Sequence, residues 1–174
     1  MKLTLPLTKT LLQPLRAGDE VYLTGVLYTA RDAAHQRLKE LQLANQTLPI
    51  TLKDTVIYYV GPTPAKPGHV IGSAGPTTSS RMDAYTPALL DLGLTGMIGK
   101  GNRSQTVINS MIKNQAVYFA AVGGAAALLS EHITACEVVV FDDLGPEAIH
   151  RLEVVDFPVI VAIDSLGNSL FTTH

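Results

Sequence analysis

Short apolar runs with the composition of buried strands recur along this chain, and they constrain its fold more than any other feature. The runs are rich in β-branched and aromatic residues, and segments with one apolar helical face separate them. Their alternation is too irregular for a simple doubly wound sheet, so we predict α/β layers. The expected strands are residues 19–28, 55–60, 96–98, 116–121, 135–141, 152–155 and 159–164, with 168–172 pairing against 159–164. The expected helices are residues 30–43, 81–92, 104–114 and 124–132.

Prolines and glycines set the expected breaks between these elements. Pro87 allows only a short or broken helix over residues 81–92, or one that begins near Pro87 itself. Residues 61–68 contain three prolines and two glycines, which is typical of a loop. Pro6 and Pro14 predict an N-terminal stretch that is extended and partly peripheral.

Length and composition exclude several classes of protein. A length of 174 residues fits a single domain, residues 1–174. The net charge is −2 and there is no basic run, which argues against binding to nucleic acid. No secretory h-region and no apolar stretch of about 18 residues is present, so we expect a cytoplasmic protein without a membrane span. Charged residues make up 16% of the chain, below the usual ~25%, which suggests that another chain covers part of the surface.

The single cysteine, Cys136, limits the metal chemistry of this chain. One thiol cannot form an internal disulfide and cannot by itself hold an iron–sulfur cluster or a structural zinc. The five histidines never fall at the spacing of metal ligands. We therefore predict that this chain has no metal site of its own.

Residues 75–83, Gly-Pro-Thr-Thr-Ser-Ser-Arg-Met-Asp, are the most informative segment. The segment combines a glycine that permits close backbone approach, four hydroxyl side chains and an arginine at an expected helix start. Backbone N–H groups at a helix start attract anions, and Arg81 can clamp a carboxylate with two parallel hydrogen bonds. The physics indicates a small-anion site, although a helix-capping loop uses the same residue types.

Two further segments carry candidate site residues. Lys100 lies between two glycines, so its ammonium can approach a ligand, although the local pattern alone favours an ordinary solvated turn. Arg31 and His35 are one helical turn apart if the helix begins at residue 30. The arginine could bind a carboxylate while the histidine moves a proton near neutral pH. In the alternative interpretation both face solvent, and Asp32 is a first-turn charge or the partner of an arginine.

Taken in order, these segments resemble the C-terminal, or β, part of class I fumarases and L-tartrate dehydratases. The matching stretches are VYLTGVLYTARDAAHQRL, YYVGP, GPTTSSRMDAY, MIGKGN and YFAAVGGAAALLSEHI, which together span residues 21–133. The resemblance implies a swivelling β/β/α domain of the fumarase C-terminal type. The length and the missing cluster cysteines look like the separate β subunit of two-chain members.

The resemblance also implies a chemistry, the reversible addition of water to a C4 dicarboxylate such as fumarate. It implies a [4Fe–4S] cluster that is bound by three cysteines of a partner α subunit and acts as a Lewis acid. Carried over position by position, the residues that contact the substrate are Arg31, Thr77, Thr78, Ser79, Ser80, Arg81 and Lys100. The resemblance implies that His35 matches an active-site histidine and that Thr77 matches a threonine proposed to take part in proton transfer. Of the two, His35 has the pKa better suited to moving a proton.

Several alternatives stay open at this point. TARDAAH looks more like fumarases than like the TCRDVCH of tartrate enzymes, so we favour fumarate over tartrate as the substrate. A non-catalytic module that binds a dicarboxylate, and a structural subunit that assembles through its Ala/Gly-rich face at residues 119–129, are rivals from other classes. The isolated chain could also form a homodimer.

Overall fold

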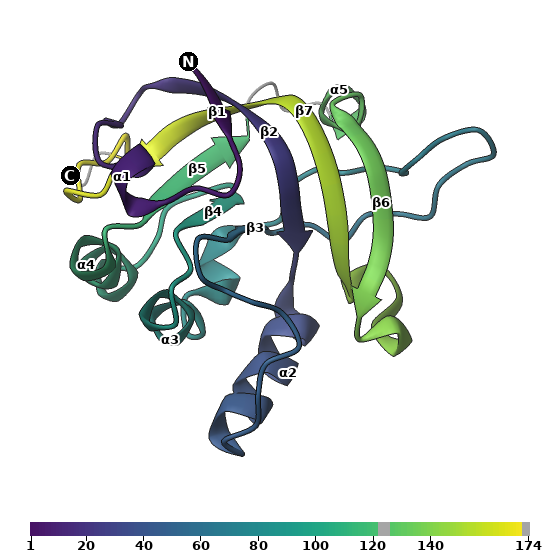
Figure 1. The fold of residues 1–174 in the computed structure, drawn as a ribbon, viewed down its shortest axis with the longest axis horizontal. Coiled ribbons are helices and arrows are strands. Elements are labelled where there is room, and N and C mark those ends of the chain that lie inside the picture. The colour runs from purple at the N-terminus through teal and green to yellow at the C-terminus, as the bar shows by residue number, and fades with distance from the viewer. Residues whose placement is uncertain (122–125, 172–174) are drawn as a thin grey trace.

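The computed structural model describes residues 1–121 and 126–171, without the side chains of residues 126 and 127. In this part of the chain a seven-stranded sheet has the order β1-β2-β3-β4-β5-β7-β6. The strands are β1 (Lys2–Thr4), β2 (Glu20–Thr29), β3 (Val56–Tyr58), β4 (Gly96–Gly99), β5 (Val117–Ala121), β6 (Ile133–Val140) and β7 (Ile149–Ile163). An additional pairing between β2 and β7 closes β2, β3, β4, β5 and β7 into a five-stranded barrel (Figure 1).

The barrel is mixed, and its long strand β7 closes it. Strands β1 to β5 run parallel, whereas β7 is antiparallel to β2, β5 and β6. The 15 residues of β7 are enough to pair along all three neighbours. Leu23 pairs with Phe157 and Phe119 with Val161, and all four side chains are fully or almost fully buried. These side chains belong to one of two apolar clusters, which lies around the barrel strands.

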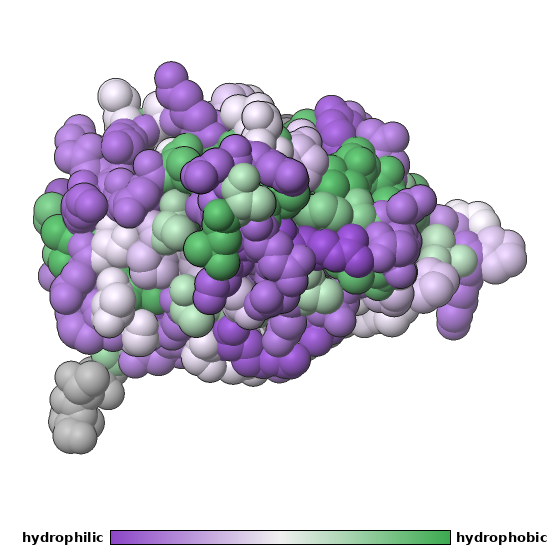
Figure 2. Space-filling view, turned by 90° about the horizontal axis from the view of Figure 1, so that it is seen from below, coloured by the Kyte–Doolittle hydropathy of each residue, from purple (hydrophilic) through white to green (hydrophobic). Residues whose placement is uncertain are grey.

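Short helices cover one side of the barrel. Five α-helices are described, α1 (Lys9–Leu12), α2 (Asp32–Leu43), α3 (Thr86–Asp91), α4 (Gln105–Asn114) and α5 (Ala126–Ser130), with two 3-10 helices, η1 (Ser79–Met82) and η2 (Asp142–Glu147). Helices α2, α3 and α4 lie below the sheet in Figure 1 and enclose the second apolar cluster, which includes Leu38, Leu89 and Met111. Figure 2, viewed from this helical side, shows a mostly hydrophilic surface with apolar patches. The predicted α/β class is confirmed.

Most expected elements are present, and the main correction concerns the last strand. Residues 152–155 and 159–164 were expected as two strands, but both lie in β7, apart from residue 164. Asp156 adopts a positive φ of 48° while its N–H bonds to Thr24 Oγ1 at 3.0 Å, so the strand passes through an irregularity instead of ending. The expected strand at residues 168–172 is reduced to one bridge between Ile163 and Ser169, and residue 172 lies outside the described residues.

Each predicted helix is present as an α-helix within its expected range. The segment around Pro87 is broken as expected, into η1 and then α3, which begins one residue before Pro87. Helix α5 falls within the expected 124–132, whose first two residues lie outside the described part. The N-terminal stretch is extended at β1 and partly peripheral, as expected, since β1 is an edge strand and most of residues 1–18 are exposed. Leu7, Leu12 and Leu15 are nevertheless fully buried and pack in the barrel cluster. In the described part of the chain no helix is long and apolar enough to cross a membrane.

Candidate functional site

The three segments singled out from the sequence meet at one edge of the barrel. Strands β2, β3 and β4 are parallel neighbours, so their carboxyl ends share an edge, the usual place for a site in such sheets. Arg31 follows β2, and Lys100 follows β4. Tyr59 follows β3, and its carbonyl accepts a hydrogen bond from the N–H of Thr77 at 2.8 Å. The topology therefore brings together residues that lie far apart in the sequence.

Backbone pairing fixes the Thr77–Ser79 run against the loop that carries Lys100. Thr78 and Lys100 form a parallel bridge, and the Ser79 N–H donates to the Lys100 carbonyl at 2.9 Å. Gly99 makes the close approach possible, since a Cβ there would collide with Ser79 Oγ. The hydroxyl segment and the lysine thus form one unit.

The start of α2 forms the other wall of the site. Asp32 lies in the first helical turn and accepts hydrogen bonds from Arg81 Nη2 at 2.8 Å and Arg81 Nε at 3.0 Å. This ion pair joins α2 to η1 and confirms that Asp32 is the partner of an arginine. Arg31 Nε lies 3.9 Å from the other carboxylate oxygen, Asp32 Oδ1.

Unpartnered buried polar atoms gather at this helix start. Among the described residues, the buried side-chain atoms without a hydrogen-bond partner are Arg31 Nε, Asp32 Oδ1 and His35 Nε2. Buried polar groups nearly always find a partner, so a cluster of exceptions within one helical turn indicates a place where a ligand or ordered water completes the bonding.

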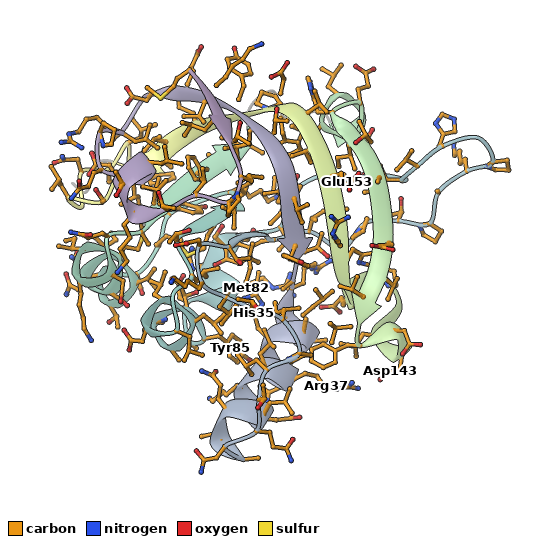
Figure 3. The ribbon with its side chains drawn as sticks, viewed as in Figure 1. His35, Arg37, Met82, Tyr85, Asp143 and Glu153 are labelled. Carbon is orange, nitrogen blue, oxygen red and sulfur yellow. The ribbon has the colours of Figure 1, made fainter. Side chains whose placement is uncertain are left out.

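His35 is enclosed and does not lie on the solvent side of its helix. It is 1% exposed, and its Nδ1 donates to the Arg31 carbonyl at 2.7 Å, which leaves Nε2 as the acceptor. The ring centres of Tyr59 and Tyr85 lie 5.6 and 5.7 Å from the centre of the His35 ring. Figure 3 shows His35 beside Met82 and Tyr85. Burial lowers the pKa of His35 to about 4, so the expected match to neutral pH is wrong and the imidazole is uncharged at pH 7.

This burial predicts a pH dependence of stability. Because the pKa of His35 falls from 6.5 in the unfolded chain to about 4 in the folded protein, the unfolded state takes up the proton first as the pH falls. The contribution of the neutral imidazole to the free energy of unfolding is fully present above pH ~6.5 and is lost as the pH falls from ~6.5 to ~4. The loss amounts to about 3 kcal/mol. Urea unfolding at pH 7 and pH 4.5 tests this, with His35→Gln as the control that cannot titrate. An equal loss of stability in both proteins would contradict the prediction.

The remaining predicted site residues differ in exposure. Thr78, Ser80, Arg81 and Lys100 are exposed, and Thr77 is half-buried. Ser79 is fully buried, and its hydroxyl lies 2.7 Å from Tyr118 Oη, so it supports the segment from behind. Arg31, Arg81 and Lys100 contribute three cations and Asp32 one carboxylate, which leaves two positive charges for a dianionic ligand.

The sequence reasoning missed the groups that lie beneath the segment. These are Tyr59, Tyr118, Asp83 and Arg103, of which Arg103 is 4% exposed. A buried arginine so close to Lys100 in the sequence is indistinguishable from a surface charge by local pattern. Only the fold shows that its side chain points inward.

The cationic side chains of the site reach the surface. Arg81 and Lys100 are exposed and the Arg31 side chain is 27% exposed, and none of the three lines any of five hollows in the described part of the chain. One hollow of about 350 Å³ lies between the 62–71 loop and β6, and includes Cys136. Ligand sites usually enclose most of a small ligand, so a second surface is needed to close this one.

The described residues do not provide ligands for a metal centre. No group of three or more His, Cys, Asp or Glu residues in the ranges 1–121 and 126–171 could hold a metal ion. Cys136 lies half-buried in β6, and burial raises the pKa of its thiol, opposite to what a metal ligand needs. An iron–sulfur cluster therefore does not fit the residues that the structure describes.

Comparison with known proteins gives one family and several relatives. The family model described as "Fumarase C-terminus" matches residues 1–174, in agreement with the predicted fold type. The chain is 44% identical over 151 residues to "Fumarate hydratase class I, anaerobic" of Escherichia coli (strain K12), covering 86% of this chain and 28% of that protein. It is 42% identical over 171 residues to "Putative L(+)-tartrate dehydratase subunit beta" of Methanocaldococcus jannaschii, covering 95% and 88%. "Fumarate hydratase 2" of Leishmania major is 38% identical over 157 residues, covering 89% and 28%.

Proposed function

Because the chain belongs to the fumarase C-terminal family of the class I fumarate hydratase and tartrate dehydratase hydro-lyases, we propose that it supplies the substrate-holding half of such an enzyme. The proposed reaction is the reversible hydration of fumarate to L-malate. The observation that carries the proposal is the convergence of Arg31, Arg81 and Lys100 beside buried polar atoms that lack partners.

The three cations suit a reaction that builds charge on a carboxylate. Removal of a proton next to a carboxylate places a second negative charge on that group. Arg31 and Arg81 can each hold a carboxylate through a planar fork, and Lys100 adds a point charge. Preorganised charges of this kind are usually the largest contribution to catalysis. Thr77, Thr78 and Ser80 add hydroxyls, and Ser79 sets the position of the run through Tyr118.

Proton transfer is assigned to Thr77 and His35 together. The Thr77 hydroxyl is the better placed of the two to touch a substrate, because Thr77 is half-buried whereas His35 is enclosed. A neutral hydroxyl is a poor base without an acceptor beside it. His35 Nε2 is an unprotonated, unpartnered acceptor at pH 7, which suits it to receive a proton inside the site.

The other half of the site comes from a partner. The relative from Methanocaldococcus jannaschii is named a subunit beta and is covered over 88% of its length, whereas the chain spans only 28% of the fumarate hydratase from Escherichia coli. We propose an α subunit as the partner, with the [4Fe–4S] cluster bound there and none by this chain. A cytoplasmic location is part of the proposal.

Tartrate is the second candidate substrate, favoured by the match to a tartrate dehydratase β subunit over 95% of this chain. The deciding experiment is anaerobic co-expression with the candidate α subunit, followed by assays on L-malate and L-tartrate. We expect kcat/KM for malate to exceed that for tartrate by roughly tenfold or more. The reverse order would make the complex a tartrate dehydratase, and turnover of neither would overturn the proposed function.

A further inference from the structure

Arg103, which follows the Lys100 loop, is a buried cation that the proposed chemistry does not use. Its side chain is 0% exposed, and its Nε donates to Asp83 Oδ1 at 2.7 Å. Its Nη2 donates to Thr86 Oγ1 at 2.8 Å. Arginine is the residue suited to such a site, since its planar fork satisfies several acceptors at once and stays charged.

Two aromatic rings enclose the guanidinium. The Arg103 Cζ lies 5.2 Å from the centre of the Tyr59 ring and 5.0 Å from that of Tyr118. A guanidinium near the face of an aromatic ring is attracted by the ring quadrupole, more strongly when water is excluded. The positions of both tyrosines therefore depend on Arg103.

Each partner of Arg103 holds a different part of the candidate site. The Tyr59 carbonyl accepts from the Thr77 N–H at 2.8 Å, and the Tyr59 ring packs against His35. Tyr118 Oη lies 2.7 Å from Ser79 Oγ and donates to the carbonyl of Gly101, beside Lys100, at 2.7 Å.

Asp83 connects the same guanidinium to a third part of the site. Asp83 is the C-cap of η1, the 3-10 helix that contains Arg81. Its second oxygen accepts from the Ser104 N–H at 2.8 Å, at the start of α4. The Asp83 carboxylate thus connects the end of η1 to the start of α4, which follows the loop that carries Lys100.

We propose that Arg103 is a positioning residue that sets the hydroxyl segment, Lys100 and His35 relative to one another for substrate binding. The proposal rests on the proposed function for its catalytic consequence. The positioning itself takes place within this chain and does not need the α subunit. Arg103 acts through Tyr59, Tyr118 and Asp83, and it does not itself touch the substrate.

The test compares Arg103→Lys with Arg37→Lys in the full chain and in the complex with the α subunit. Arg37 is the control, since it pairs with Asp143 and its Cζ lies 5.4 Å from the centre of the Phe141 ring. Figure 3 shows Arg37 beside Asp143. Lysine keeps the charge and loses the fork. Asp83→Asn, which removes the main partner of Arg103, is a second variant in case Arg103→Lys fails to fold.

Amide hydrogen exchange reads the positions directly. In Arg103→Lys, the amides of Thr77 and Ser79 are expected to exchange about tenfold faster, while the amide of Val161, bonded to Asp19 within the barrel, is unchanged. Arg37→Lys is expected to change neither site amide. Unchanged site amides, or a uniform increase along the whole chain, would overturn the proposal.

Kinetics separate positioning from a purely structural role. In the complex, Arg103→Lys is expected to lower kcat/KM for malate by about 10- to 100-fold, mostly through KM, with Arg37→Lys near wild type. Faster exchange at the site amides with wild-type kinetics would also overturn the proposal. If the wild-type complex hydrates no dicarboxylate, the proposed function fails, and the exchange data still decide whether Arg103 sets the segment.

Discussion

Replacement of Arg81 by alanine in the assembled enzyme is expected to lower kcat/KM for malate by about 10²- to 10³-fold. Arg81 presents a planar fork at the rim of the site, and in this chain the fork pairs with Asp32. Both donors, Nε and Nη2, reach the single oxygen Asp32 Oδ2, whereas a substrate carboxylate offers one acceptor oxygen to each. The variant therefore loses one of the two arginine forks proposed to hold the substrate carboxylates.

The same variant is expected to fold almost normally. The Arg81 side chain is 50% exposed, and exposed ion pairs contribute only about 0–1 kcal/mol to stability. Arg37→Ala removes a comparable pair on the opposite side of α2 and serves as the control. Steady-state kinetics with urea unfolding of each variant separates the two effects. A wild-type rate in Arg81→Ala would remove Arg81 from the site.

Replacement of Gly99 by alanine is expected to destabilise the chain by about 1–3 kcal/mol. The added Cβ would collide with Ser79 Oγ and lie 2.8 Å from Tyr59 Cδ2. Gly99 lies in β4, which is buried along its whole length, so the strand cannot move outward to relieve the collision. Ser79 must leave Tyr118, which shifts the hydroxyl segment and lowers activity as well as stability.

Gly96→Ala on the same strand is the matched control. There the nearest contact would be Val56 Cγ2 at 3.0 Å, a milder overlap than the collision with Ser79 Oγ at Gly99. Thermal or urea unfolding should therefore rank wild type above Gly96→Ala and Gly96→Ala above Gly99→Ala. Addition of Ser79→Ala to Gly99→Ala removes the colliding hydroxyl and should recover part of the loss. Equal stability of Gly99→Ala and wild type would contradict the close packing of the two segments.

Sequence reasoning found the strands and the broken helix because their signals are local. Alternating or continuous apolar runs mark strands wherever they pair, and Pro87 restricts its own backbone and that of the residue before it. Closure of the barrel could not be predicted from the sequence, because the pairing of β2 with β7 joins residues more than a hundred positions apart. Residues 152–155 and 159–164 were expected as two strands, and only the pairing with the neighbouring strands shows that one strand passes through the gap between them.

The candidate site was predictable in part. Local composition alone did not separate Arg31, Arg81 and Lys100 from surface charges or a helix cap. They became candidates because their segments occur in the same order as in one known family. Burial was not predictable, since whether His35 faces solvent depends on Tyr59 and Tyr85, which come from other segments. The residues beneath the site were missed for the same reason; these are Tyr59, Tyr118, Asp83 and Arg103.

The most direct measurement of the central claim is reconstitution under anaerobic conditions. This chain, a candidate α subunit with its cluster loaded, and an equimolar mixture are each assayed for hydration of fumarate and dehydration of L-tartrate. We predict no turnover by this chain alone, because the proposed cluster belongs to the α subunit, and turnover of a C4 substrate by the mixture. Turnover by the isolated chain at the rate of the mixture would contradict the account, as would a mixture with a loaded cluster that acts on neither substrate.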